Sequence, residues 1–373
     1  MRIGILTLPL HTNYGGILQA YALQTVLERM GHEVVILNQP FHRKGLSLGQ
    51  KMKAYPKRLV KKYLLRRKTV KIFRESYIDK VQPIVEQYTR VFVNKYLHIQ
   101  TVSNFNTLFS TDFDMLVVGS DQVWRPSPHV DIYHFYLDFA KDWNVKRIAY
   151  AASFGTEEWE YTLEETEKCK HLVQLFDKVT VREKSGVGLC HDKFGIHASC
   201  VLDPTMLLDK NDYISLFDVD QCSQGKHILL VYILDMNDEK ESLIQKIANE
   251  KHLIPLYVNS KVEDLNADLK ERIQPPVENW LKGFYNADFV ITDSFHACVF
   301  SILFNKPFVV YGNKARGLAR FSSLLSTFHL ENRFISSADE YRNLSPIDFA
   351  QTNLILKEMK DMSIKYLEHE CTK

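Results

Sequence analysis

The sequence lacks a cysteine framework, a long apolar run and a marked excess of one charge. Its six cysteines are scattered, with no Cys-x-x-Cys pair, which argues against a disulfide scaffold and a cysteine zinc site. No His-Glu-x-x-His motif or Cys/His cluster indicates a metal. No run is long enough to span a membrane, and the apolar start is too short for a signal peptide. The formal net charge of +2 argues against a general polyanion binder. We therefore expect a cytoplasmic protein that binds no nucleic acid.

What the sequence does contain is a steady alternation of β-rich runs and helical patterns. The opening unit reads RIGILTL, GILQAYALQTVLERMG and EVVILNQ, a strand, a helix and a strand. Similar runs continue to the end of the chain, which predicts an α/β protein with parallel sheets covered by helices. A chain of 373 residues suits two lobes. We expect an N-terminal lobe at 1–205, a connection at 206–226, a C-terminal lobe at 227–338, and a final amphipathic helix within 339–373 that has a Ser-Pro start and packs back on the lobes.

One segment contains no acidic residue. Between His42 and Arg74 lysine and arginine are frequent, and apolar residues are interleaved with them. The segment lies in an expected helical insertion at about 42–98 in the first lobe. One interpretation is a basic amphipathic helix, Lys57–Lys71, that contacts an anionic membrane surface or a lipid-phosphate substrate. The other is a solvated insertion whose apolar residues pack on the lobe. The pattern leaves both open.

Ligands of open α/β sheets bind beyond the carboxyl ends of the strands. The first stretch at such an end is HTNYGGILQ, with Asn13, Gly15 and Gly16. The glycines let the backbone approach a ligand, and the following helix offers free N–H groups to an anion. A plain tight turn explains the glycines almost as well.

Two more stretches end strands in the same lobe. In VVGSDQVW, the polar residues Ser120, Asp121 and Gln122 follow an apolar run. Asp121 could orient or deprotonate a sugar hydroxyl, but position alone favours a helix N-cap at Ser120 or Asp121. In VTVREKSG, Arg182 ends a β-branched strand and offers a fork for carboxylate or phosphate. Its alternative is a surface salt bridge with an acid such as Glu183.

The fourth stretch is FVITDSFHACVFSILFNKPFVVYGNK in the second lobe. It carries Asp293, Ser294 and His296 where a strand passes into a helix, and Lys314, Arg316 and Arg320 after the next strand. A histidine beside a helix N-terminus and a basic cluster is suited to proton transfer next to a bound anion. A capping or core histidine is the ordinary alternative, and the basic residues favour function.

These stretches, in this order, resemble the polysaccharide pyruvyl transferase family. The resemblance rests on NYGGILQAYALQ, VVGSDQVW, VTVRE, LDPTMLL and ADFVITDSFHACVFSILFNKPFVVYG, and it covers most of the chain. It implies two Rossmann-like lobes facing a cleft, as in the GT-B architecture. It also implies transfer of the pyruvyl group of phosphoenolpyruvate onto two hydroxyls of a sugar in a surface or exopolysaccharide precursor. The product is a cyclic ketal, phosphate is released, and no cofactor is needed besides phosphoenolpyruvate as co-substrate.

The resemblance also implies roles for residues. By position, His296 matches the catalytic histidine, Arg182 an arginine that engages the donor, and Lys314 a basic donor-binding residue. Many members have an arginine two places before the histidine, where this chain has Ser294. Either Arg316 or Arg320 then supplies that charge, or the donor differs. Our hypothesis is that His296 exchanges protons, Arg182 and Lys314 hold the donor, and Asp121 orients the acceptor.

Two other functions remain open. A GT-B-like nucleotide-sugar glycosyltransferase would need a carboxylate for the ribose and an apolar slot for the base, whereas His296, Lys314 and Arg316 suit a compact dianion better. A non-catalytic sugar-binding protein would not need a titratable group at the helix start. No pattern identifies the acceptor sugar. If the basic insertion lies on the inner face of a membrane, a lipid-linked saccharide is the expected acceptor.

Overall fold

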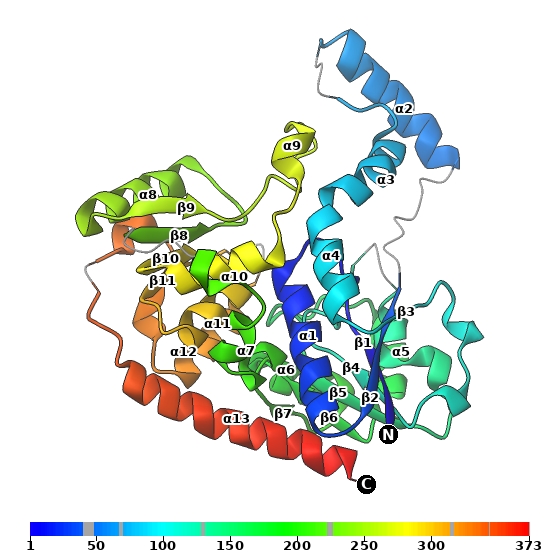
Figure 1. Ribbon diagram of the computed structural model, residues 1–373. Helices are drawn as coiled ribbons and strands as arrows, with labels where there is room; N and C mark the ends of the chain where they lie inside the picture. Colours follow the sequence, from blue (N-terminus) through cyan, green and yellow to red (C-terminus); the bar gives the residue numbers. More distant parts are fainter. Residues whose placement is uncertain are drawn as a thin grey trace.

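The computed structural model describes residues 1–39, 48–66, 70–127, 131–221, 227–313, 317–342 and 344–372. Its strands form two sheets, one in each half of the chain (Figure 1). The first sheet contains β1 (Arg2–Leu6), β2 (Glu33–Asn38), β3 (Ile99–Thr101), β4 (Met115–Val118), β5 (Lys146–Ala152), β6 (Lys178–Val181) and β7 (Ser199–Cys200). The second contains β8 (Ile228–Tyr232), β9 (Ile254–Tyr257), β10 (Phe289–Thr292), β11 (Phe308–Tyr311) and β12 (Phe334–Ile335).

Both sheets are parallel, which confirms the prediction from the apolar runs. The first has the order β3-β2-β1-β4-β5-β6-β7 and the second β12-β11-β10-β8-β9. Strands β4, β8, β10 and β11 are buried along their whole length, as parallel strands are when helices cover both faces. The strand order reverses between β1 and β4 and between β8 and β10, and ligands of such sheets bind outside the carboxyl ends at these switch points.

Helices cover the sheets and join the two lobes. They are α1 (Tyr14–Arg29), α2 (Leu48–Tyr63), α3 (Arg74–Val85), α4 (Gln87–Tyr96), α5 (Leu163–Val173), α6 (Lys184–Leu189), α7 (Lys210–Ile214), α8 (Asp238–Lys251), α9 (Leu269–Arg272), α10 (Val277–Asn286), α11 (Phe295–Leu303), α12 (Ala319–Thr327) and α13 (Phe349–Cys371). Figure 1 shows α2 to α4 rising from the first lobe, with α2 standing away from the rest of the molecule.

The last helix, α13, runs back along both lobes (Figure 1). It begins at Phe349, and the Asp348 side chain accepts a hydrogen bond from the backbone N–H of Gln351 at 3.1 Å. The expected Ser-Pro start is therefore wrong by a few residues, because the Asp348 side chain satisfies a free N–H of the first turn. At its other end, Glu370 forms an ion pair of 3.0 Å with Lys146 at the start of β5.

The start of α1 packs against the second lobe. Tyr14 is fully buried, and its ring centre lies 5.5 Å from that of Trp280 in α10. The Tyr14 hydroxyl donates to the Pro275 carbonyl at 2.8 Å. The largest apolar cluster accordingly runs through both lobes, and it includes Ile17 and Leu18 of α1. This packing holds the loop before α1 against the first turn of α11.

Candidate active site

Polar residues from four strand ends meet between the two lobes. Asp121 follows β4, Arg182 follows β6, Asp203 follows β7, and His296 lies in the first turn of α11 after β10. All four side chains are almost completely buried. Because three belong to the first lobe and one to the second, the site exists only where the lobes touch.

Arg182 holds the first-lobe part of the site together. Its Nη1 lies 2.7 Å from Asp203 Oδ2, and its Nη2 lies 2.9 Å from Asp121 Oδ1. The guanidinium is inaccessible to solvent, so the alternative, a salt bridge with Glu183 at the surface, is wrong as to its location. That carboxylate is 3.9 Å from Nε and is buried as well. The loops after β4, β6 and β7 thus each bring one carboxylate to the Arg182 guanidinium.

The charged groups of this cluster keep one another ionised. Burial alone would raise the pKa of Asp121, but the positive charge of Arg182 and the other nearby cations lower it. The pKa of Asp203 is likewise lowered, against the effect of burial, by its contacts with His296 and Arg182. Burial would lower the pKa of Arg182, yet Asp121 and Asp203 raise it. All three groups are therefore charged at neutral pH.

His296 reaches this cluster from the second lobe. Its Nε2 lies 3.6 Å from Asp203 Oδ2 and 3.5 Å from Arg182 Nη1. Its other ring nitrogen faces Gly15 in α1, where an added Cβ would lie only 2.0 Å from Nδ1. No side chain larger than hydrogen fits there, so Gly15 is needed for the close approach of the histidine.

The other predicted residues of the first lobe lie around Asp121. Asn13 donates from Nδ2 to Asp121 Oδ2 at 3.4 Å, and Gly16 lies beside the Asn13 side chain. The Ser120 hydroxyl donates to the Ala151 carbonyl at 2.8 Å, while Gln122 accepts from Arg125 at 3.3 Å. Ser120 and Gln122 thus stabilise the loop after β4.

The N-cap expected at Ser120 or Asp121 is wrong. No helix begins there in the described part of the loop. Instead Asp121, with a φ of 72°, forms an isolated parallel bridge with Ala152, the last residue of β5. The reason is tertiary, since the Asp121 carboxylate binds Arg182 and not a helix N-terminus.

In the second lobe the structure describes only some of the predicted residues. Ser294 occupies the N-cap position of α11 without a capping bond from its side chain, and its backbone N–H donates to Thr292 Oγ1 at 3.0 Å. Asp293 forms a buried ion pair of 2.8 Å with Lys240, which takes it away from the site. Lys314 and Arg316 lie outside the described residues.

Two residues of the site, Asp203 and Phe295, were not predicted from the sequence. Asp203 also accepts from the Thr205 hydroxyl at 2.7 Å and fixes the loop after β7. Phe295 lies under two guanidinium groups, with the carbons of Arg182 and Arg320 at 4.5 and 5.6 Å from its ring centre. Burial, and then the repulsion of Arg182, lower the pKa of Arg320 to about 10. Asp203 does follow a β-rich run, so the strand-end rule could have found it.

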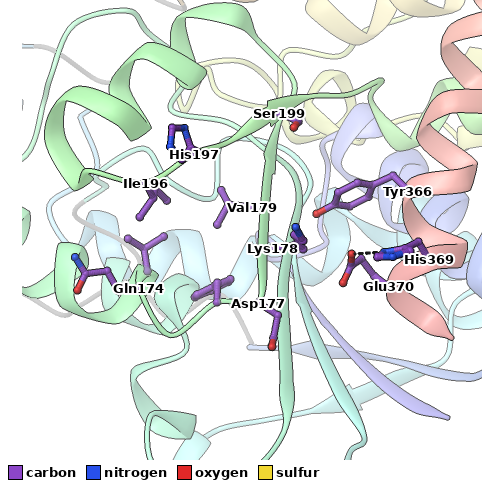
Figure 2. Close-up of a pocket in the computed structure, with 12 residues that line it drawn as sticks. Gln174, Asp177, Lys178, Val179, Ile196, His197, Ser199, Tyr366, His369 and Glu370 are labelled. Carbon is purple, nitrogen blue, oxygen red and sulfur yellow. Dashed lines mark hydrogen bonds and ion pairs between the residues drawn. The ribbon is translucent and has the colours of Figure 1, made fainter. Parts of the chain in front are cut away.

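A separate pocket lies at the other end of the first sheet. It has a volume of about 590 Å³ and is bounded by the start of β6 and by α13 (Figure 2). Lys178 at its wall begins the strand that Arg182 follows, so the pocket and the site are at opposite ends of β6. His369 and Glu370 form an ion pair of 2.9 Å at its edge. In the described part of the chain, no cluster of His, Cys, Asp or Glu could hold a metal ion.

The comparison with protein families decides the relationship. Residues 13–315 match the model of the polysaccharide pyruvyl transferases. The chain belongs to the polysaccharide pyruvyl transferase family. The match contains every named site residue except Arg316 and Arg320, which follow it in the sequence. A search of curated proteins finds no match for the sequence.

Solved structures show the fold of this family member to be GT-B-like. Anabaena Alr3699/HepE in complex with UDP and glucose is similar with a TM-score of 0.53 and 10% identity, covering 100% of this chain and 98% of that chain. Arabidopsis thaliana UGT89C1 complexed with UDP has a TM-score of 0.51 and 8% identity, covering 100% of both chains. At such identities the likeness concerns the fold alone.

Gly15→Ala is expected to push His296 away from Asp203, because the new Cβ would overlap the imidazole. Such overpacking should lower the free energy of unfolding by about 1–3 kcal/mol and abolish transferase activity. Gly16→Ala is the matched control, since its Cβ would meet only the Asn13 amide at 3.2 Å. It should change stability by less than about 1 kcal/mol. Equal behaviour of the two variants in thermal unfolding and turnover would contradict the assigned role of Gly15.

Asp203→Asn is expected to lower the free energy of unfolding by about 3–5 kcal/mol at neutral pH, because it removes one partner of a buried ion pair. The lowered pKa of Asp203 means that the ionised form stabilises the fold above its unfolded pKa of about 4. This stabilisation is lost as pH falls toward the folded pKa, so the difference from the natural protein should shrink below about pH 4.

The control is Asp192→Asn, which removes a carboxylate that is 70% exposed and pairs with His191. It should cost less than about 1 kcal/mol at any pH. Urea unfolding of the three proteins between acid and neutral pH measures both effects. A pH-independent loss in Asp203→Asn would mean that its carboxylate is not held ionised by Arg182 and His296.

Proposed function

We propose that this protein transfers the pyruvyl group of phosphoenolpyruvate onto two hydroxyls of a saccharide, forming a cyclic ketal and releasing phosphate. Membership of the family supports the reaction class. The finer statement rests on the residues at the meeting point of the lobes, where His296 lies beside the buried Arg182. A second buried guanidinium, that of Arg320, lies near the ring of the neighbouring Phe295.

The observation that carries the proposal is the pair of arginines on Phe295. Arg320 is buried, and its pKa is lowered to about 10 by burial and by the nearby Arg182. Burial of this cation is unfavourable, so an anion that comes close to it stabilises it. Phosphoenolpyruvate brings a phosphate and a carboxylate, and both would find positive charge here. Lys314 and Arg316, on the connection just before α12, are proposed to add to it.

Arg182 then has a different part from the one that the resemblance implies. Both of its Nη atoms already bind Asp121 and Asp203, so they are not free to form a fork on the donor. We assign to Arg182 the role of keeping both carboxylates ionised and in position. Its positive charge still acts on a donor bound above Phe295, which lies 4.5 Å from the guanidinium carbon.

His296 is the proposed acid and base. Asp203, held ionised next to its Nε2, is proposed to orient the imidazole, which delivers a proton to the methylene carbon of the donor. The first sugar hydroxyl attacks the neighbouring carbon, the bond to the phosphate oxygen breaks, and the second hydroxyl attacks the same carbon. One hydroxyl proton restores His296 and the other leaves with phosphate. Asp121 and Asn13, on the opposite lobe, are proposed to orient the acceptor.

Access to the site requires movement. Arg182 is inaccessible and His296 is only 6% exposed when the lobes are together. Donor and acceptor would enter while the lobes are apart, and closure would then exclude water and bring His296 to Asp203.

The alternative donor is a nucleotide sugar. The fold supports it, since the two similar structures described above both contain UDP. Nucleotide sugars are therefore compared with phosphoenolpyruvate in the same binding experiment.

Donor binding can be measured by thermal shift. Phosphoenolpyruvate is expected to raise the unfolding midpoint, since a ligand at a hundred times its Kd adds about 2.7 kcal/mol of stability. UDP-, GDP- and CMP-sugars should have no such effect. Arg320→Met should lose the response because it removes the buried cation, whereas Arg342→Met, at an exposed position, should keep it. A shift produced by one nucleotide sugar alone would replace our proposal with the glycosyltransferase function.

Turnover tests the histidine separately from binding. His296→Gln should still be stabilised by phosphoenolpyruvate but should release phosphate at least about a hundredfold more slowly, since a general acid and base contributes about that much or more. Phosphate release is followed with a panel of saccharides, and the ketal methyl group is detected by NMR. Full activity of His296→Gln would remove the residue from the mechanism, whereas the loss of donor stabilisation would make it a binding residue.

A further inference from the structure

Helix α2 exposes apolar side chains on one side. Its apolar residues recur at helical spacing along the same stripe. Their exposed fractions are 77% for Leu48, 71% for Met52, 41% for Leu59, 47% for Val60 and 66% for Tyr63. A surface helix of a globular protein normally turns such a stripe toward the core. Here the stripe is turned toward solvent.

The contacts of α2 explain which side is exposed. Arg58 forms a double ion pair with Glu75 of α3, at 2.7 and 2.9 Å, and donates to the Ile72 carbonyl at 3.0 Å. The rings of Tyr55 and Phe73 meet edge to face at 5.1 Å. These contacts attach one side of α2 to the start of α3. The apolar stripe lies to the side of this attachment, and Figure 1 shows no other element near α2.

The same helix concentrates positive charge. Its sixteen residues hold six lysines and arginines and no acid, although the whole chain carries a formal net charge of only +2. Only Arg58 of the six is paired with a carboxylate within the described residues. Lys53 and Lys57 are exposed along the border of the apolar stripe. A helix that exposes apolar and basic side chains together suits a surface that is both apolar and anionic.

We propose that α2 docks the protein on an anionic membrane surface. The apolar stripe would enter the boundary between headgroups and acyl chains, and the lysines would bind the anionic headgroups. None of the described helices is long and apolar enough to cross a bilayer. Because α2 has an apolar and a basic side, it would lie in the plane of the membrane surface. A second copy of the chain would bring two strongly positive helices together, and a nucleic acid would leave the apolar stripe without a partner.

Docking through α2 also orients the protein. The insertion that holds α2 begins just after the carboxyl end of β2 and returns at β3, so it leaves the first sheet at the edge where Asp121 and Arg182 lie. Figure 1 shows α2 beyond this edge. The site would therefore face the membrane side. If the proposed function holds, an acceptor saccharide linked to a membrane lipid would lie within its reach.

The test is sedimentation of the full chain with vesicles. We expect binding to an equal mixture of phosphatidylcholine and phosphatidylglycerol and little binding to phosphatidylcholine alone. Replacing Lys53 and Lys57 together by glutamine should weaken binding about fivefold for each lysine. Replacing Met52, Leu59 and Tyr63 together by serine should abolish it. Neither variant should change the unfolding midpoint, because these side chains are exposed.

The matched control replaces three exposed apolar residues elsewhere, Leu163, Leu354 and Met362, by serine, and it should bind as the natural protein does. Failure of the natural protein to sediment with the anionic vesicles would overturn the proposal, as would equal binding by the α2 variants. A dimer in solution that the α2 serine variant turns into a monomer would instead assign the stripe to a second copy. Vesicle binding is measured without donor or acceptor, so its result is independent of the proposed reaction.

Discussion

The candidate site depends on the ion pairs of one buried arginine. Arg182 bonds Asp121 after β4 and Asp203 after β7, and it thereby fixes three strand ends of the first sheet relative to one another. A buried guanidinium without these carboxylates would be strongly destabilising, and the carboxylates would not stay ionised in this interior without the cation. The second lobe adds His296 to a cluster of one guanidinium and two carboxylates, and Asp203 gives its imidazole an ionised neighbour.

A steric constraint makes the site and the lobe interface depend on each other. Gly15 admits the His296 ring, while its neighbour Tyr14 packs on Trp280 and bonds the Pro275 carbonyl. The first residue of α1 therefore anchors the lobes, and the second makes room for the histidine. Any change in the relative position of the lobes must alter the separation of His296 and Asp203. In the proposed mechanism, lobe closure and proton transfer are thus coupled through adjacent residues of α1.

The rule that strand ends carry ligands explains most of what the sequence could predict. Asp121, Arg182 and His296 each follow an apolar strand closely, and the structure brings them together. Which groups would pair was not predictable, since it depends on the order β4-β5-β6-β7 and on contact between lobes. The N-cap expected near Asp121 failed for the same reason, because a buried ion pair outweighs a local preference. For Arg320 the sequence predicted only a possible source of positive charge. Its position near the ring of Phe295 arises from tertiary packing and was not predictable.

The GT-B-like fold leaves the donor undecided, because one scaffold carries many chemistries. The residues at the end of β10 are more informative. A nucleotide site there would need an accessible carboxylate for the ribose, but Asp293 is 1% exposed, pairs with Lys240 at 2.8 Å and accepts from the backbone N–H of Leu234. It is therefore occupied in joining β10 to the start of α8. What this strand end offers instead is a histidine beside Arg182, with Arg320 also near the ring of Phe295. Such a set is suited to binding a small anion and transferring a proton, which supports the proposed donor, phosphoenolpyruvate, over a nucleotide sugar.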